Sequence, residues 1–282
     1  MVGAVIVVYN PDVNLLNKVY KSISDHIDHV LIVVNGNENQ VEKKYFENII
    51  FLNENVGIAK ASNVGANYLF ENFNLKYVIF CDQDTVFSSV YFKELQESIQ
   101  LNSNLIYAPK YLNENIGEVE NRLVVRKSNR VYSTILESEN VYQVIASGMA
   151  VPKECYIKLK GFREDLFIDW VDIEFCWRCY KNGFKIKMLN TQVSHRLGDS
   201  SIKIGNIQVP LRSGIRYYYL IRNGYYLALN FNHGSIKINL WYFVKVSKEF
   251  LGYTILSIFK LKDLKLIFKG LIHGLTGKLN SL

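Results

Sequence analysis

The chain has 282 residues, of which 49% are hydrophobic and only four are Pro, and its formal net charge is +7. This composition excludes disordered and collagen-like proteins, and the length suffices for one large core with a small appendage. Four cysteines without framework spacing predict a reduced, cytoplasmic setting. We interpret Cys176-Trp177-Arg178-Cys179 as helix packing, because a lone CxxC lacks the second ligand pair of a zinc site.

Strands and helices are expected to alternate through the first hundred residues. Runs of β-branched and aromatic residues predict strands at 2–9, 29–34, 49–52 and 77–81. Apolar residues at helical spacing predict helices at 13–24, 58–70 and 91–99. Such alternation predicts a parallel sheet covered by helices on both faces. The apolar N-terminus has no basic segment before it, which fits a first buried strand better than a signal peptide.

Polar residues close each of these strands, where a parallel sheet places its ligands. They are Tyr9-Asn10, Asn35-Gly36-Asn37, Asn53-Glu54-Asn55 and Asp82-Gln83-Asp84. Two carboxylates one residue apart suit a divalent metal such as Mg²⁺ or Mn²⁺, although a plain polar turn is the alternative. No GxGxxG follows the first strand, so a dinucleotide site is not supported.

A hairpin opens the second half of the chain, with strands at 122–125 and 131–136 and a turn between them. A strand at 141–145 follows, and Ala146-Ser147-Gly148 then allows a close backbone approach. The next acidic segment leads into a helix from Asp172 to Tyr180, with Gly183 as its C-cap.

Asp172 is therefore expected at or near the start of that helix, where a plain N-cap is the structural alternative. A cap needs one carboxylate, but Asp169 and Glu174 lie nearby as well, which favours a site. Glu174 and Arg178 are four residues apart and can pair on the helix surface.

Residues 231–282 are basic, aromatic and amphipathic. They hold eight lysines against Glu249 and Asp263, and thus six of the seven net positive charges. We expect helices lying on an anionic membrane surface; helices packed on the core with solvated lysines are the alternative. The longest uncharged run, 250–259, is too short to span a bilayer, and no nucleic-acid module is present, so a nucleic-acid partner is not expected.

Seven motifs occur in a fixed order along residues 1–225. They are Tyr9-Asn10-Pro11, 55–65 (NVGIAKASNVG), Asp82-Gln83-Asp84, Ala146-Ser147-Gly148, 167–174 (FIDWVDIE), 194–198 (SHRLG) and 216–223 (RYYYLIRN). Each alone is weak, but together they resemble glycosyltransferase family 2, and most closely its bacterial rhamnosyltransferase branch. The resemblance implies a GT-A fold: an α/β protein with a Rossmann-like, mainly parallel sheet flanked by helices. We expect this domain over 1–205 and a helical, membrane-associating extension over 206–282.

The resemblance also implies site residues. Asp84 matches the metal-binding Asp, Asp82 lies by the ribose and the metal, and His195 completes the metal set. Asp172 matches the general base, with Asp169 and Glu174 as support. The nucleotide-lining positions are Tyr9, Asn10, Asn35, Asn55, Gly57 and Asn63. Asn35 stands where the family usually has an acid. Arg216 or Arg222 can add a bidentate phosphate contact.

The implied activity is metal-dependent, inverting transfer of a sugar from a nucleotide donor. We expect rhamnose from a dTDP-sugar and a lipid-linked or surface-polysaccharide acceptor at the cytoplasmic face of the membrane. A UDP-hexose or UDP-galactofuranose donor is the alternative within the fold. Residues 80–86 also resemble the nucleophile loop of haloacid-dehalogenase-type phosphatases, although that loop usually follows the first strand. A non-catalytic saccharide-binding protein is the third possibility.

Overall fold

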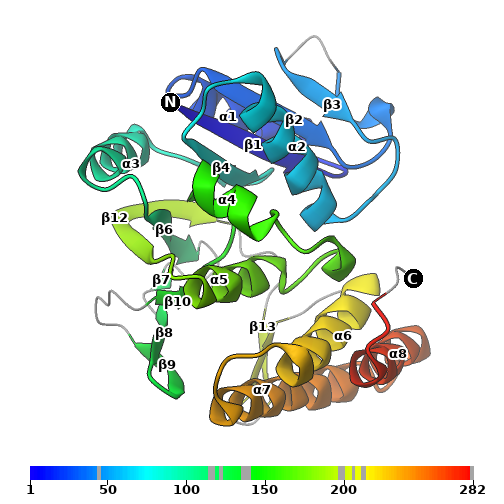
Figure 1. Cartoon of the computed structure of the whole chain (residues 1–282). Coiled ribbons are helices and arrows are strands. Elements are labelled where there is room, and N and C mark those ends of the chain that lie inside the picture. Colours follow the sequence, from blue (N-terminus) through cyan, green and yellow to red (C-terminus); the bar gives the residue numbers. More distant parts are fainter. Residues whose placement is uncertain are drawn as a thin grey trace.

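The structure is a computed structural model of the whole chain (Figure 1). It describes all residues except 43–45, 114–117, 121–122, 135–140, 196–200, 205–206, 211–213 and 280–282, and it does not describe the side chains of 112–123, 133–140 and 194–213. The first half contains β1 (Val2–Val8), α1 (Val13–Ser24), β2 (His29–Val34), β3 (Ile49–Phe51), α2 (Ile58–Asn72), β4 (Tyr77–Asp82), β5 (Thr85–Val86) and α3 (Ser89–Leu101).

The N-terminal part of the sheet is parallel, with strand order β3-β2-β1-β4. Residues of β1 alternate between two apolar layers, because successive strand side chains point to opposite faces. Val5 and Val7 pack with α2, whereas Ala4 and Ile6 pack with α1 and α3. The alternating strands and helices predicted for this half are confirmed.

Small residues on α2 let that helix lie close to the sheet. A Cβ atom at Gly65 would stand 2.5 Å from Val5 and 2.9 Å from Val33. The start of α2 is thereby held near the carboxyl ends of β1 and β2.

The second half turns the sheet from parallel to mixed. Its elements are β6 (Ile106–Asn113), β7 (Glu118–Glu120), β8 (Leu123–Lys127), β9 (Arg130–Thr134), β10 (Val141–Gln143), β11 (Met149–Pro152), α4 (Lys153–Leu159), α5 (Val171–Lys181), β12 (Ile186–His195), β13 (Ser201–Ile204) and β14 (Ile207–Pro210). The path continues from β4 as β11-β6-β12-β10-β8-β9, with β11 antiparallel to both β4 and β6. The predicted hairpin is β8–β9, and Cys176 and Cys179 are buried in α5 as expected.

Three helices complete the chain: α6 (Ile215–Asn230), α7 (Ile236–Leu256) and α8 (Leu261–Thr276) (Figure 1). α6 and α8 lie in close contact at two glycines of α8. A Cβ atom at Gly270 would lie 2.6 Å from the carbonyl oxygen of Tyr218, and one at Gly274 would lie 2.6 Å from that of Arg222. The Tyr218 hydroxyl also hydrogen bonds to Nδ1 of His273 over 2.7 Å. The helical extension is confirmed. A domain boundary at residue 205 stays a prediction, and α6 makes hydrogen bonds across it.

Candidate active site

The acidic triplet lies at the carboxyl end of β4. Asp82 is the last residue of the strand, and Asp84 stands in the turn before β5. The Gln83 side chain accepts from the Tyr9 N–H over 2.7 Å and donates to the Tyr9 carbonyl over 3.2 Å. The ends of β1 and β4 are therefore joined.

The backbone of His195 lies beside this triplet. β5 pairs antiparallel with the end of β12, and His195 stands opposite Thr85, the residue after Asp84. The side chain of His195 is outside the described residues, so its approach to Asp84 stays a prediction. Strand pairing thus brings the backbone of His195 to the triplet, as the family resemblance implied, although the two segments lie far apart in the sequence.

Asp172 is the second residue of α5 and is bound to backbone on two sides. Its Oδ1 accepts from the Ile173 N–H over 2.8 Å, and its Oδ2 accepts from the Ala146 N–H over 3.3 Å. The next residue, Ser147, accepts from the Asp82 N–H over 3.1 Å through Oγ. The short segment Ala146-Ser147 thus connects Asp172 to Asp82.

The surroundings of Asp172 keep its proton bound to unusually high pH. The pKa of Asp172 is raised to about 6, mainly because burial desolvates the carboxylate; the negative charge of Asp82 adds to the rise, and the N–H groups of Ile173 and Ala146 oppose it. A carboxyl poised near neutral pH suits general base catalysis.

The segment before α5 has an unusual backbone. Phe167, Asp169 and Trp170 have φ angles of 66°, 62° and 66°, in the left-handed region that non-glycine residues rarely adopt. Gly57 makes room for this segment, because a Cβ atom there would stand 2.7 Å from the Phe167 carbonyl oxygen. Such a backbone persists only where its surroundings fix it.

Side chains and backbone of α6 supply that support. Nδ2 of Asn223 lies within 2.8–2.9 Å of the carbonyl oxygens of Leu166, Ile168 and Asp169. Trp170 Nε1 donates to the Leu220 carbonyl over 3.1 Å. We call residues 165–170 the clamped loop.

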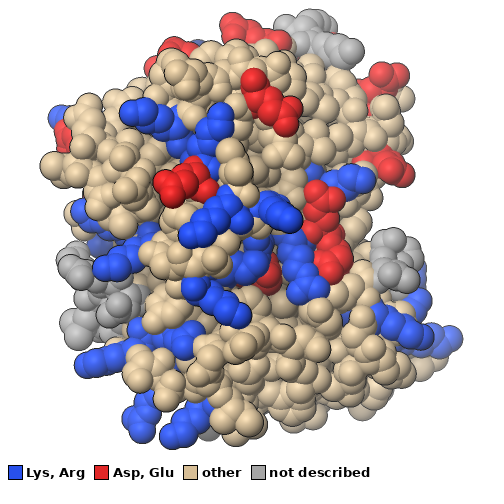
Figure 2. Space-filling model, in the orientation of Figure 1, with Lys and Arg blue, Asp and Glu red and all other residues tan. Residues whose placement is uncertain are grey.

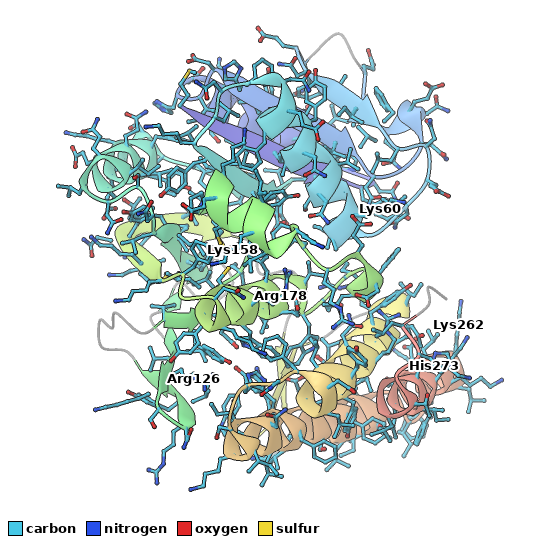
Figure 3. The ribbon with its side chains drawn as sticks, in the orientation of Figure 1. Lys60, Arg126, Lys158, Arg178, Lys262 and His273 are labelled. Atoms are coloured by element: carbon cyan, nitrogen blue, oxygen red, sulfur yellow. The ribbon has the colours of Figure 1, made fainter. Side chains whose placement is uncertain are left out.

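Several predicted site residues belong to this support. Arg216 pairs with Asp169 over 2.7 Å, so both hold the clamped loop. Arg222 is fully buried and donates to the Asp165 and Leu166 carbonyls, which differs from the expected phosphate contact. The predicted Glu174–Arg178 pair is confirmed at 2.8 Å, with Glu174 only 2% exposed (Figure 3 labels Arg178).

Asn63 also lies in a buried network. Its amide nitrogen donates to the Phe162 carbonyl and to Glu164, and its oxygen accepts from the Phe162 N–H. These bonds use both amide hydrogens inside the protein, so the geometry assigns Asn63 to holding residues 162–164 on α2.

The remaining residues predicted to line the nucleotide lie at the carboxyl ends of the strands. The buried Asn35 amide donates to Asn55 Oδ1 over 3.0 Å, and the same oxygen accepts from the Gly57 N–H over 3.1 Å. Asn10 pairs with Gln40 at the exposed rim, and Tyr9 is 47% exposed. Asn10 and Asn53 have φ angles of 46° and 61°, so turn conformation contributes to the choice of Asn at both strand ends.

Sequence reasoning missed one buried member of the site. Tyr111 on β6 donates its hydroxyl proton to the Ser147 carbonyl over 2.7 Å. Burial raises the pKa of Tyr111 well above its usual value, with Asp82 and Asp172 among the nearby negative charges. Nothing in the local sequence distinguishes this tyrosine from the other buried ones.

Of the residues predicted to bind a metal, Asp82 and Asp84 have described side chains. Among the described side chains, which exclude His195, no group of three or more His, Cys, Asp or Glu gathers as a metal site. Asp82 and Asp84 are both partly buried residues at the carboxyl end of β4. One atom, Oδ1 of Asp84, is fully buried. Two hard oxygen donors fit Mg²⁺ or Mn²⁺ when phosphate oxygens and water supply the other ligands.

Comparisons with known proteins relate the chain to one family of enzymes. The model of Glycosyl transferase family 2 matches residues 4–158. The dTDP-rhamnosyl transferase RfbF of Shigella flexneri is 30% identical over 246 residues, which cover 84% of this chain and 82% of that protein.

Solved structures share the fold. TarS 1–349 of S. aureus has a TM-score of 0.59 at 15% identity, over 99% of this chain and 82% of that one. GalNAc-T7 with UDP, GalNAc and Mn²⁺ has a TM-score of 0.57 at 14% identity, over 93% of this chain. This chain spans 58% of the length of the GalNAc-T7 chain. The expected GT-A fold is confirmed.

Replacing Asn223 by Ala tests the support of the clamped loop. The change leaves the Ile168 and Asp169 carbonyls without the Asn223 donor, whereas the Leu166 carbonyl keeps its bond from Arg222, and we expect the free energy of unfolding to fall by about 3 kcal/mol. Denaturant unfolding measures the loss. Asn230→Ala is the control, because its amide donates to one carbonyl at the exposed end of α6. Equal stability of the two variants would contradict the proposed support.

Proposed function

The chain belongs to glycosyltransferase family 2, and we propose that it transfers rhamnose from dTDP-rhamnose to a saccharide acceptor with inversion. The identity of the donor is supported by the similarity to the Shigella flexneri transferase. The observation that carries the mechanism is the connection of Asp172 to Asp82 through Ala146-Ser147.

Asp172 acts as the general base. It accepts the proton of the acceptor hydroxyl as that oxygen bonds to the anomeric carbon, while the bond from that carbon to the diphosphate oxygen breaks. A single displacement from the opposite face inverts the anomeric centre, so no enzyme nucleophile is needed. A positioned carboxylate contributes about 10²–10⁴-fold to such a step.

Asp82, Asp84 and His195 would hold a divalent metal, which when bound stabilises charge on the departing diphosphate. Tyr9, Asn10, Asn35, Asn55 and Gly57 form the surface offered to the nucleoside. Arg216 orients the clamped loop through Asp169.

The acceptor in this proposal is lipid-linked, as in the assembly of a surface polysaccharide such as O antigen, and the enzyme binds the cytoplasmic face of an anionic membrane. The turn between α7 and α8 exposes Phe259 at 96% and Leu261 at 73%, with Lys260 and Lys262 beside them. In Figure 2 the lower part of the molecule, where Figure 1 places the C-terminal helices and the β8–β9 hairpin, is mostly uncharged, with Lys and Arg towards its edges and no acidic side chain in that view. No helix among the described residues meets the length and hydropathy needed to cross a bilayer.

A donor screen tests the reaction. We expect release of dTDP from dTDP-rhamnose in the presence of acceptor and Mn²⁺, and loss of turnover with a chelator, because the diphosphate then departs without charge neutralisation. UDP-glucose and UDP-galactofuranose are the matched donors. Turnover of a UDP-sugar but not of dTDP-rhamnose would contradict the assignment of the donor. A trapped aspartyl phosphate would contradict glycosyl transfer altogether.

The change Asp172→Asn removes the base and keeps the size of the side chain. We expect kcat to fall by about 10²–10⁴-fold while dTDP binding, measured by calorimetry, is unchanged. Asp165→Asn is the control, because Asp165 lies in the clamped loop and its carboxylate pairs with Arg163 on the surface. Wild-type turnover by Asp172→Asn would refute the assignment of the base.

The acidic side of the pH–rate profile reports the ionisation of the Asp172 carboxyl. Asp172 accepts a proton only when ionised, so kcat/KM should rise with pH through about 6 and then level off, since its pKa is raised to about 6. A higher Mn²⁺ concentration should move this rise to lower pH, because cation binding offsets the charge of Asp82. A profile that is flat across about pH 5 to 7 would contradict the prediction.

A further inference from the structure

A hollow lies near the C-terminal end of α5, away from Asp172. Its volume is about 270 Å³, and it is lined by Arg126, Tyr142, Trp177, Tyr180, Lys181, Phe231, Asn232, His233 and Gly234. Eight residues of helix separate Asp172 from Tyr180, which corresponds to about 12 Å along α5. Figure 3 labels Arg126 on the β8–β9 side of this helix. The hollow is smaller than most drug-sized sites and suits one small ring.

Aromatic side chains form the walls of the hollow, and Arg126 holds two of them in place. The Arg126 guanidinium carbon lies 5.3 Å from the Tyr142 ring centroid and 4.8 Å from that of Tyr180. Its nitrogens donate to the Tyr142 hydroxyl and the His233 carbonyl. Tyr180 remains 37% exposed and presents its ring at the mouth. A fixed aromatic ring at the edge of a hollow is a platform for the apolar face of a sugar.

A buried hydrogen-bond donor completes the hollow. Nδ1 of His233 lies 2.6 Å from the Tyr142 hydroxyl, which already accepts from Arg126. Arginine can only donate, so the Tyr142 proton is directed to Nδ1, and we assign the proton of the neutral imidazole to Nε2. Burial lowers the pKa of His233 to about 3, which keeps the ring neutral.

Nε2 of His233 is buried and has no hydrogen-bond partner among the described residues, and His233 itself is 3% exposed. A buried N–H without an acceptor costs about 1–3 kcal/mol, so an oxygen supplied by a ligand is favoured there. The residues that line the hollow include no Asp or Glu.

We propose that this hollow binds one sugar ring of the saccharide acceptor, stacked on Tyr180 and with one of its oxygens accepting from Nε2 of His233. The sugar it holds is remote from the one that receives rhamnose, so the hollow adds affinity and takes no part in the chemistry. This inference rests on the proposed function only in naming the acceptor as the source of the sugar.

Binding without donor tests the hollow separately from the transfer reaction. The probes are methyl glycosides of rhamnose, glucose, galactose and N-acetylglucosamine, titrated by saturation-transfer NMR against the full chain. We expect at least one to bind with millimolar affinity to the wild type, and Tyr180→Ala to weaken it at least tenfold. Tyr180→Phe keeps the ring and should bind as the wild type does. Tyr68→Ala is the control, because Tyr68 is similarly exposed at 36% but lies on α2.

The kinetic readout is the KM for a long acceptor. Tyr180→Ala should raise this KM about tenfold with kcat and dTDP affinity unchanged. The reason is that the lost contact stabilises the bound acceptor equally in the ground state and in the transition state. Absence of binding by every glycoside to the wild type, or equal binding by Tyr180→Ala, would overturn the proposal and leave a buried water as the partner of His233. Failure of dTDP-rhamnose turnover with glycoside binding intact would overturn the proposed reaction and leave the hollow standing.

Discussion

The clamped loop is the constraint on which the site depends. Each of its three left-handed residues costs of order 1–3 kcal/mol relative to an ordinary backbone, and α6 offsets that cost with buried hydrogen bonds. The loop ends directly at α5, so the position of Asp172 follows from how α6 holds the residues before it. Release of the loop would free the first turn of α5 from its register with Ala146 and Ser147.

The C-terminal helices therefore help to position the site, and they also form the surface proposed to bind the membrane. Gly270 and Gly274 allow α8 to touch the backbone of α6, and the Arg222 side chain joins the end of α8 to the clamped loop by donating to Leu279 as well as to Leu166. In Figure 1 these helices pack below α5 as one layer. The surface proposed to bind lipid and the clamped loop are thus parts of one packed unit.

The sequence predicted the elements of the first hundred residues well because their apolar periods are local. It also placed Asp172 at the start of a helix and paired Glu174 with Arg178. It did not predict the strands β6, β11 and β12 of the second half, or that Arg222 and Asn63 lie in buried networks. Residue type shows that a side chain can form hydrogen bonds, whereas the folded neighbours decide whether a nucleotide or a carbonyl receives them. Tyr111 was missed for the same reason.

The proposed mechanism depends on Asp172 and Asp82 lying close enough for their charges to interact. The most direct test is the pKa of Asp172, measured by carbon-13 NMR titration of its carboxyl group in the metal-free wild type and in Asp82→Asn. We expect a pKa of about 6 for Asp172 in the wild type, and a lower pKa in the variant because one negative neighbour is removed. An Asp172 pKa that is the same in both proteins would show that the two carboxylates do not interact, and would contradict the account.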